Sequence, residues 1–257
     1  MDRGGGRAQC GRWPIGLALT ACVLLTPGIV YAADLVLWAW ERPEDLRFAS
    51  HSAEVAVQTG FIVLSGDQVI ARGRRFPLRA EPGQASTALV HVQIDHRRPL
   101  ALDPAAEVAA ARAVLAYARA PWVRRVQVDF EVRESERPIL LRLLHGVRTG
   151  LPADVSLSMT ALTSWCETET WLGQAPVDEI VPMLFRMGRG GAALRAKLAS
   201  GGDFAEPRCR QALAISTDAP VPRAPAGRRV YVFNPRSWTA ADFAKVRRNV
   251  EAWRAPS

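Results

Sequence analysis

Most short motifs that identify a common class of enzyme are missing from this chain of 257 residues. It has no Gly-x-Ser-x-Gly segment of the kind that presents a nucleophilic serine. It also lacks the glycine-rich loop with a lysine that binds nucleotide phosphates. The 4 histidines have no paired spacing typical of zinc ligands. We therefore expect neither a metal ion nor a cofactor, and the acidic and aromatic side chains become the candidates for function.

Long basic runs and a second long apolar segment are also missing. The formal net charge is +8, but the arginines are scattered and do not alternate with aromatic residues, so nucleic acid is not an expected partner. A solvated surface explains this charge, and so does attraction to acidic envelope polymers or anionic lipids. Beyond the N-terminal segment, we expect no membrane span. No pattern in the sequence indicates an oligomeric state.

The N-terminal segment has the pattern of an export signal. Three arginines precede an apolar stretch over residues 13–31, and Val30-Tyr31-Ala32 fits a cleavage site of small residues. We therefore predict a signal peptide at 1–32 and a periplasmic or secreted domain at 33–257. A lipoprotein anchored through an acylated Cys22 and an uncleaved anchor are the alternatives.

Only two cysteines remain after such a cleavage, Cys166 and Cys209. An even number in an oxidising compartment predicts a disulfide between them. Two unpaired buried thiols are the alternative. Two isolated cysteines lack the spacing of a zinc finger, which argues against a metal pair.

Strand-like and helix-like runs alternate along the rest of the chain. The strand-like runs lie at 35–40, 55–64, 88–95, 126–132, 155–162, 179–186, 211–216 and 230–234. The helix-like runs lie at 104–119, 135–149, 191–199 and 239–253. This alternation predicts a parallel α/β architecture, and eight strands favour a closed (β/α)8 barrel of the TIM type over an open sheet.

We expect this barrel to be slightly degenerate. Residues 42–54 leave room for only a short first helix. The pair Gly66-Asp67 predicts a β-hairpin after the second strand, continuing into 69–75. Residues 217–227 are rich in proline and alanine, which predicts that the seventh helix is missing.

The segment from Val126 to Ser135 is the most informative part of the sequence. Its apolar and polar residues alternate, so that Gln127, Asp129 and Glu131 share one face of a strand. Neighbouring runs have similar polar faces, formed by His91, Gln93 and Asp95 and by Ser156, Ser158 and Thr160. If the apolar faces pack under the helices, the polar faces lie inside the barrel, near the mouth where barrel enzymes hold their active sites. A satisfied polar network in the core is the alternative interpretation.

Two neighbouring acids on one face suggest acid chemistry. Carboxylates that repel each other in a partly dry pocket raise one pKa, so that one group holds a proton near neutral pH. Glu131 is nearer the mouth and is the candidate general acid. Asp129 lies one pleat deeper and is the candidate for orienting substrate or stabilising positive charge. Asp95 and Glu41 are further acids placed to contact the substrate.

Aromatic side chains gather at the same strand ends. They are Trp38, Trp40, Trp165 and Phe185. Aromatic rings stack on the apolar faces of sugars, so acids and aromatics at a barrel mouth together predict a carbohydrate ligand. A role in capping the core explains any one of these tryptophans equally well.

Four segments resemble a bacterial family of exported proteins of unknown function. They read LVLWAWERPEDL, VQVDFEV, LSMTALTSWC and VDEIVPMLFRMG, and they extend from the start of the predicted barrel to its sixth strand. That family is in turn similar to barrel glycosidases of the chitinase class, which carry Asp-x-Asp-x-Glu on the fourth strand. The resemblance implies that Glu131 is the acid, that Asp129 orients an N-acetyl group of the substrate, and that Gln127 replaces the first acid.

The sixth strand departs from the chitinase pattern Met-x-Tyr-Asp. Met183 is kept, but Phe185 and Arg186 replace the tyrosine and the aspartate. We still expect these three residues to line the substrate site, while the two departures argue against the substrate-assisted mechanism of that class. We therefore expect a glycoside hydrolase-like barrel acting on an envelope or extracellular polysaccharide. A non-catalytic barrel that binds glycans or associates with the envelope is the alternative.

Overall fold

The computed structural model describes residues 35–187, 190–219, 223–225 and 227–253. The expected signal peptide at 1–32, including Cys22, lies outside these residues and stays a prediction. All described residues fall within one compact unit. No helix in the described ranges has both the length and the apolar character needed to cross a bilayer.

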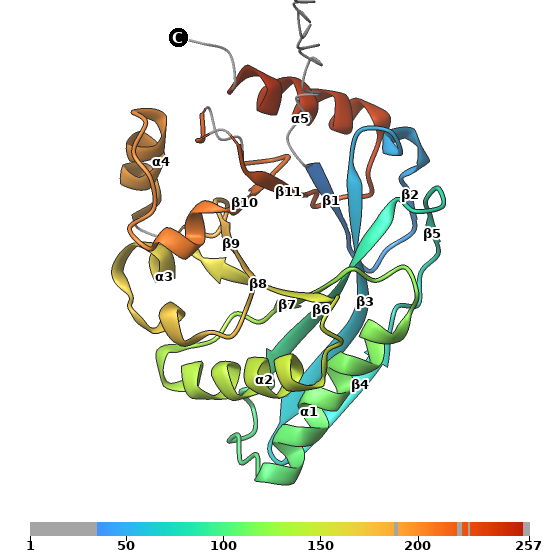
Figure 1. Cartoon of the computed structure of the whole chain (residues 1–257), viewed down its shortest axis with the longest axis vertical. Coiled ribbons are helices and arrows are strands. Elements are labelled where there is room, and N and C mark those ends of the chain that lie inside the picture. Colours follow the sequence, from blue (N-terminus) through green and yellow to red (C-terminus); the bar gives the residue numbers. More distant parts are fainter. Residues whose placement is uncertain (1–34, 188–189, 220–222, 226, 254–257) are drawn as a thin grey trace, which may run out of the picture. The chain divides into compact units, whose positions relative to one another are not determined.

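Eight parallel strands close into a barrel (Figure 1). They are β1 (Leu35–Ala39), β3 (Glu54–Ser65), β6 (Ala85–Ile94), β7 (Arg125–Asp129), β8 (Ser156–Leu162), β9 (Glu179–Met183), β10 (Ala212–Ser216) and β11 (Arg229–Phe233). The ring closes because β1 pairs in parallel with both β3 and β11. Each of these strands overlaps one of the predicted runs, so the predicted (β/α) barrel is confirmed.

Helices follow most of the strands and lie outside the ring (Figure 1). The α-helices are α1 (Pro104–Ala116), α2 (Arg137–Gly150), α3 (Thr163–Thr168), α4 (Gly191–Ala199) and α5 (Ala240–Ala252). Short 3-10 turns are η1 (Arg47–Ala49), η2 (Tyr117–Arg119), η3 (Glu134–Glu136), η4 (Trp171–Gln174) and η6 (Pro207–Arg210). Polar caps explain two helix starts: the Asp103 carboxylate accepts from the Ala106 amide at 2.7 Å, and the Thr239 hydroxyl from the Asp242 amide at 3.1 Å.

The connection between β1 and β3 contains very little helix, and β3 is followed first by strands. Between β1 and β3 the chain forms only β2 (Glu44–Asp45) and the three-residue turn η1. After β3 it folds back as the antiparallel strand β4 (Gln68–Gly73), and then β5 (Leu78–Arg79) pairs with β2. Between β10 and β11, the residues that the structure describes contain no helix. The strand β4 occupies the position predicted for the hairpin after the second strand.

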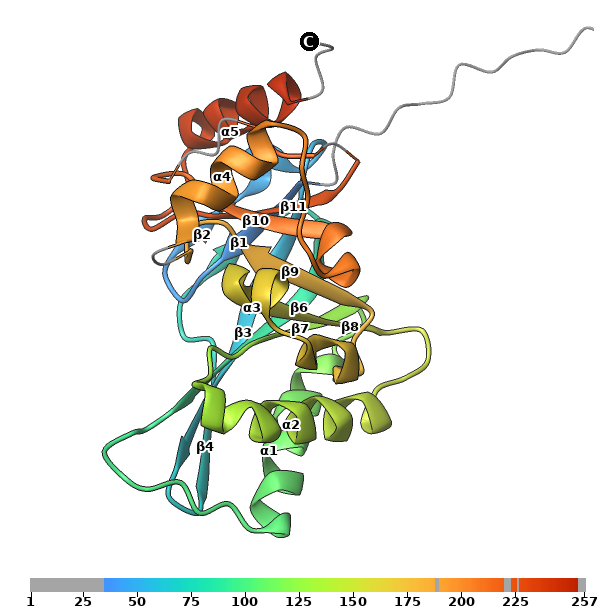
Figure 2. The ribbon, with the colours of Figure 1, turned by 90° about the vertical axis from the view of Figure 1, so that its left-hand side faces the viewer.

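Two glycines let α1 and α2 approach each other closely (Figure 2). A Cβ atom added at Gly146 would lie 2.8 Å from the Cβ of Ala111, and one at Gly150 would lie 2.3 Å from a methyl of Leu115. Both distances are too short for real atoms. A side chain at Gly146 would push the helices apart, whereas one at Gly150 would require the end of the Leu115 side chain to move. The two helices thereby pack side by side over the outer face of the barrel.

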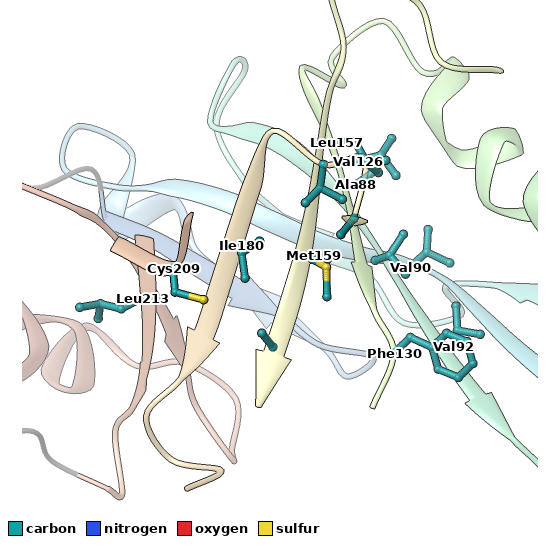
Figure 3. Packing of buried hydrophobic residues seen from close by; sticks show 14 of the residues in the cluster. Ala88, Val90, Val92, Val126, Phe130, Leu157, Met159, Ile180, Cys209 and Leu213 are labelled. Carbon is teal, nitrogen blue, oxygen red and sulfur yellow. The ribbon is translucent and has the colours of Figure 1, made fainter. Parts of the chain in front are cut away.

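The apolar faces of the strands point outward, as the alternation predicts. Val126, Val128 and Phe130 are buried in the core between strands and helices. Figure 3 shows Val126 and Phe130 among the side chains of the neighbouring strands. The opposite face of β7 points into the barrel, where Gln127 and Asp129 are also buried. One strand therefore divides an apolar outer layer from a polar interior.

A disulfide joins Cys166 on α3 to Cys209 in η6 and confirms the predicted pairing. Both cysteines are completely buried. The Glu206 amide also donates to the Cys166 carbonyl at 2.9 Å. The segment after β8 is therefore held against the segment that leads into β10.

Replacing Cys166 and Cys209 together with alanine should destabilise the barrel. The crosslink spans 43 residues of sequence, and restricting the unfolded chain over such a loop contributes about 3–4 kcal/mol. Denaturant unfolding should show this loss, and wild-type protein kept in a reductant should fall to the same stability. A double variant as stable as the oxidised wild type would contradict the crosslink.

Candidate functional site

A cavity of about 680 Å³ opens at the carboxyl ends of the barrel strands. Its size is within the range of about 300–1,000 Å³ that is typical of ligand sites. Seven of the eight barrel strands, or the residues just after them, and the hairpin strand β4 contribute to its lining: Trp38, Trp40, Glu41, Arg42, Gln58, Phe61, Arg72, His91, Asp129, Glu131, Met183, Phe185, Arg186, Ser216, Asp218, Ala219 and Phe233. This is the end of the barrel at which enzymes of this fold hold their active sites.

The barrel interior next to this cavity is filled by a closed hydrogen-bond network. Gln127 accepts from the Trp38 indole at 2.8 Å and donates to the Ser158 hydroxyl at 3.1 Å. Ser158 donates to Glu179 at 2.8 Å, and the Tyr231 hydroxyl donates to the same carboxylate at 2.7 Å. Gln127 is fully buried and does not line the cavity. For this residue the structure supports the alternative of a satisfied polar core.

Asp129 lies at the end of β7 and is held by two neighbouring strands. His91 and Asp129 are directly paired between β6 and β7, so both side chains lie at the same height inside the barrel. One carboxylate oxygen is 2.7 Å from Nδ1 of His91, and the other accepts from the Thr160 hydroxyl at 2.6 Å. Only 7% of the Asp129 side chain is exposed. The aspartate is therefore a fixed, nearly dry acceptor at the cavity surface.

Glu131 lies two residues further along the chain, where β7 has ended. Its side chain is 40% exposed and one oxygen is 3.4 Å from Nε of Arg186. Partial loss of water around the carboxylate raises its pKa above the usual range. The Arg186 charge opposes this shift, the negative Asp129 adds to it, and His91 opposes it more weakly. Glu131 thus holds a proton more readily than an ordinary glutamate does.

Glu41, the other predicted acid near β1, is bound by two arginines. Its oxygens lie 2.5 Å from Nη1 of Arg72 and 3.0 Å from Nε of Arg75. The hydrogen bond from Arg72 is the main reason why the pKa of Glu41 is lowered. Glu41 lines the cavity as a negative charge that is already paired.

Aromatic rings form much of the cavity wall. Phe185 stacks on Phe233 with ring centroids 5.5 Å apart, and Trp38 meets Phe185 edge-on at 6.3 Å. Trp40 meets Phe233 edge-on at 5.8 Å. Phe61 stacks on His91 at 5.3 Å. The wall is apolar but presents ring faces and edges beside the charged groups.

Eight of the predicted site residues are brought together around this cavity. They are Trp38, Trp40, Glu41, Asp129, Glu131, Met183, Phe185 and Arg186. Asp95 does not line it, because β3 and β6 continue past the end of β7. There Asp95 binds Arg97 at 2.8 Å, which lowers its pKa to about 2. Trp165 is also absent from the lining, because it is buried on α3 against Trp171, with ring centroids 5.0 Å apart.

Several lining residues are not among those predicted. Gln58 and Phe61 both line the cavity although they are three residues apart. An irregularity in the pairing of β3 with β6, between Gln58 and Gly60, shifts the phase of the strand there. Strict alternation therefore misses one of the two. Asp218 is an exposed acid that accepts from the Ser216 hydroxyl, in a connection without helical or strand periodicity.

His91 is the most important residue that the sequence analysis did not assign to the site. Its place on a polar strand face is readable from the sequence, but its contact with Asp129 depends on the register of two strands. Among the described residues, no group of three or more histidine, cysteine, aspartate or glutamate side chains is placed to bind a metal ion.

No family model, curated protein or solved structure matches this chain. The resemblance to exported bacterial proteins and to the chitinase class therefore stays a prediction.

The pKa of Glu131 should lie above the ordinary value of 4.5. Replacing Arg186 with glutamine should raise it further, because the positive charge that favours the ionised form is removed. The side-chain carboxyl carbon of Glu131 can be titrated by ¹³C NMR in both proteins. A Glu131 that titrates at or below 4.5 in wild type, or a fall in the variant, would contradict the electrostatics described here.

Proposed function

We propose that this protein is a barrel glycoside hydrolase that acts on an envelope or extracellular polysaccharide. The observation that carries the proposal is a glutamate of raised pKa, Glu131, beside an aromatic-walled cavity at the carboxyl end of a TIM-type barrel. In this proposal Glu131 is the general acid, and it protonates the oxygen of the departing sugar.

The other acids at the cavity are less suited to donate a proton. Asp129 accepts hydrogen bonds on both oxygens, and Glu41 is paired with two arginines. Hydrogen bonds and cations of this kind favour the ionised form of a carboxyl group. Glu131 combines partial burial with a position on the cavity surface, which a proton donor to a ligand requires.

The cavity wall suits a sugar. Sugars have apolar ring faces and polar edges, and the rings of Phe185, Phe233 and Trp40 provide apolar surface beside charged groups. The disulfide between Cys166 and Cys209 supports an oxidising compartment, as expected for a periplasmic or secreted protein.

A non-catalytic glycan-binding barrel is the second candidate, and the pair between Glu131 and Arg186 favours it. An arginine 3.4 Å away stabilises the carboxylate in its ionised form. In a binding protein this pair would donate and accept hydrogen bonds to sugar hydroxyls without any proton transfer.

Changing Glu131 to glutamine should reduce kcat on polysaccharides or alkyl glycosides by about 10²–10⁴-fold, the usual contribution of general acid catalysis. The measurement is a screen of glycan substrates with wild-type and variant proteins, with sugar binding followed by calorimetry. Glu134→Gln is a matched control, because Glu134 also has an arginine at 3.4 Å but its side chain is 85% exposed.

Three outcomes separate the two candidates. Loss of turnover in E131Q with the control unaffected supports the hydrolase. Binding without turnover in every protein supports the glycan-binding barrel. Equal turnover in wild type and E131Q overturns the role of Glu131.

A further inference from the structure

We infer that His91 is the general base of this cavity, held by Asp129, and that it activates the water molecule that attacks the sugar. This inference rests on the proposed function and adds to it the second group of the reaction. The hydrolase would then use a carboxylic acid and an imidazole in place of a pair of carboxylates.

Contacts on several sides fix the His91 ring. Its Nδ1 is 2.7 Å from Asp129, and its face stacks on Phe61 at an interplanar angle of 19°. Trp40 meets the ring edge-on, with centroids 5.7 Å apart. Asp129 is itself fixed by the Thr160 hydroxyl at 2.6 Å. The ring is therefore positioned by aromatic contacts and by a chain of two hydrogen bonds.

The direction of these hydrogen bonds determines which nitrogen is basic. An ionised aspartate only accepts hydrogen bonds, so Nδ1 must carry the proton in its contact with Asp129. In the neutral ring, Nε2 is then the unprotonated nitrogen. Among the described residues no hydrogen bond engages Nε2, and His91 lines the cavity with 25% of its side chain exposed. The base is thus formed and open toward the space where a ligand would lie.

The carboxylates around the cavity are worse candidates for the base. Both oxygens of Asp129 already accept hydrogen bonds, and both oxygens of Glu41 contact arginines. Asp218 accepts from Ser216 in an exposed connection. His91 is held in one orientation and keeps a nitrogen that no hydrogen bond given for the described residues engages.

The step balances without any further reactant. Nε2 of His91 takes one proton from water while the water oxygen bonds to the anomeric carbon. The bond between that carbon and the departing oxygen breaks, and the oxygen takes the proton of Glu131. His91 ends as imidazolium and Glu131 as carboxylate. His91 then releases one proton to solvent and Glu131 takes one up, which restores both groups. Water on the opposite side from the leaving group gives a product of inverted configuration.

The tautomer of His91 can be tested without a substrate. Long-range ¹H–¹⁵N NMR of histidine-labelled protein, at a pH where the ring is neutral, should show a proton on Nδ1. Loss of the signal in H91N assigns it. In D129N the asparagine amide can donate to Nδ1, so that the ring proton should move to Nε2. A wild-type proton on Nε2 would overturn the inference, because that nitrogen could not then accept one.

The closing experiment compares leaving groups in wild type, H91N, E131Q and H145Q. Asparagine retains an amide donor for Asp129 but provides no base, so H91N should lose about 10²–10⁴-fold in kcat. This loss should be the same for an alkyl glycoside and for a dinitrophenyl glycoside, since both need water activated. The loss of kcat in E131Q should largely disappear on the dinitrophenyl glycoside, because its dinitrophenolate group departs without being protonated. H145Q removes an exposed histidine on α2 and should match wild type.

The outcomes separate this inference from the proposed function. Turnover by wild type with an undiminished H91N, or with a product of retained configuration, overturns the base but leaves the hydrolase. An H91N defect that shrinks on the dinitrophenyl substrate, as in E131Q, also overturns it, because His91 would then act through Glu131. Wild type that hydrolyses no glycoside overturns both.

Discussion

The in-register pairing of β6, β7 and β8 is the constraint on which the rest of the site depends. Parallel strands place paired residues at one height, and alternation directs every second side chain inward. Gln127 is thus level with Ser158, and one pleat nearer the mouth Asp129 is level with His91. A shift of one residue would turn these groups into the apolar outer layer, where they would have no partners.

The two polar layers differ in what they leave unsatisfied. In the deeper layer, Gln127, Ser158 and Glu179 bond to one another and to Trp38 and Tyr231, so little is left for a ligand. The layer at the mouth keeps partly exposed polar groups at His91 and Glu131. A buried polar atom without a partner costs about 1–3 kcal/mol. The hydrogen bonds within the deep layer stabilise the ring. In the layer at the mouth fewer polar groups have protein partners, which suits the binding of a ligand.

Periodicity predicts the strands and their faces well, because both depend on neighbouring residues. The outward face of β7, the hairpin at Gly66-Asp67 and the start of α1 at Pro104 all follow local rules. The height of a residue along the barrel axis does not follow local rules, because it depends on pairing between strands that are distant in the sequence. Asp95 therefore shares the predicted polar face and yet lies beyond the mouth, while the partner of Asp129 comes from a strand 38 residues earlier.

The hairpin of β3 and β4 separates the closure of the ring from the shape of its opening. Residues 54–57 of β3 pair with β1 and close the barrel, whereas residues 60–65 pair with β4. From β4, Arg72 reaches the cavity and binds Glu41. One side of the opening is thus built by a segment that the ring does not need. The hairpin can therefore change in length or sequence without altering the strand pairs between β1 and β3 that close the ring.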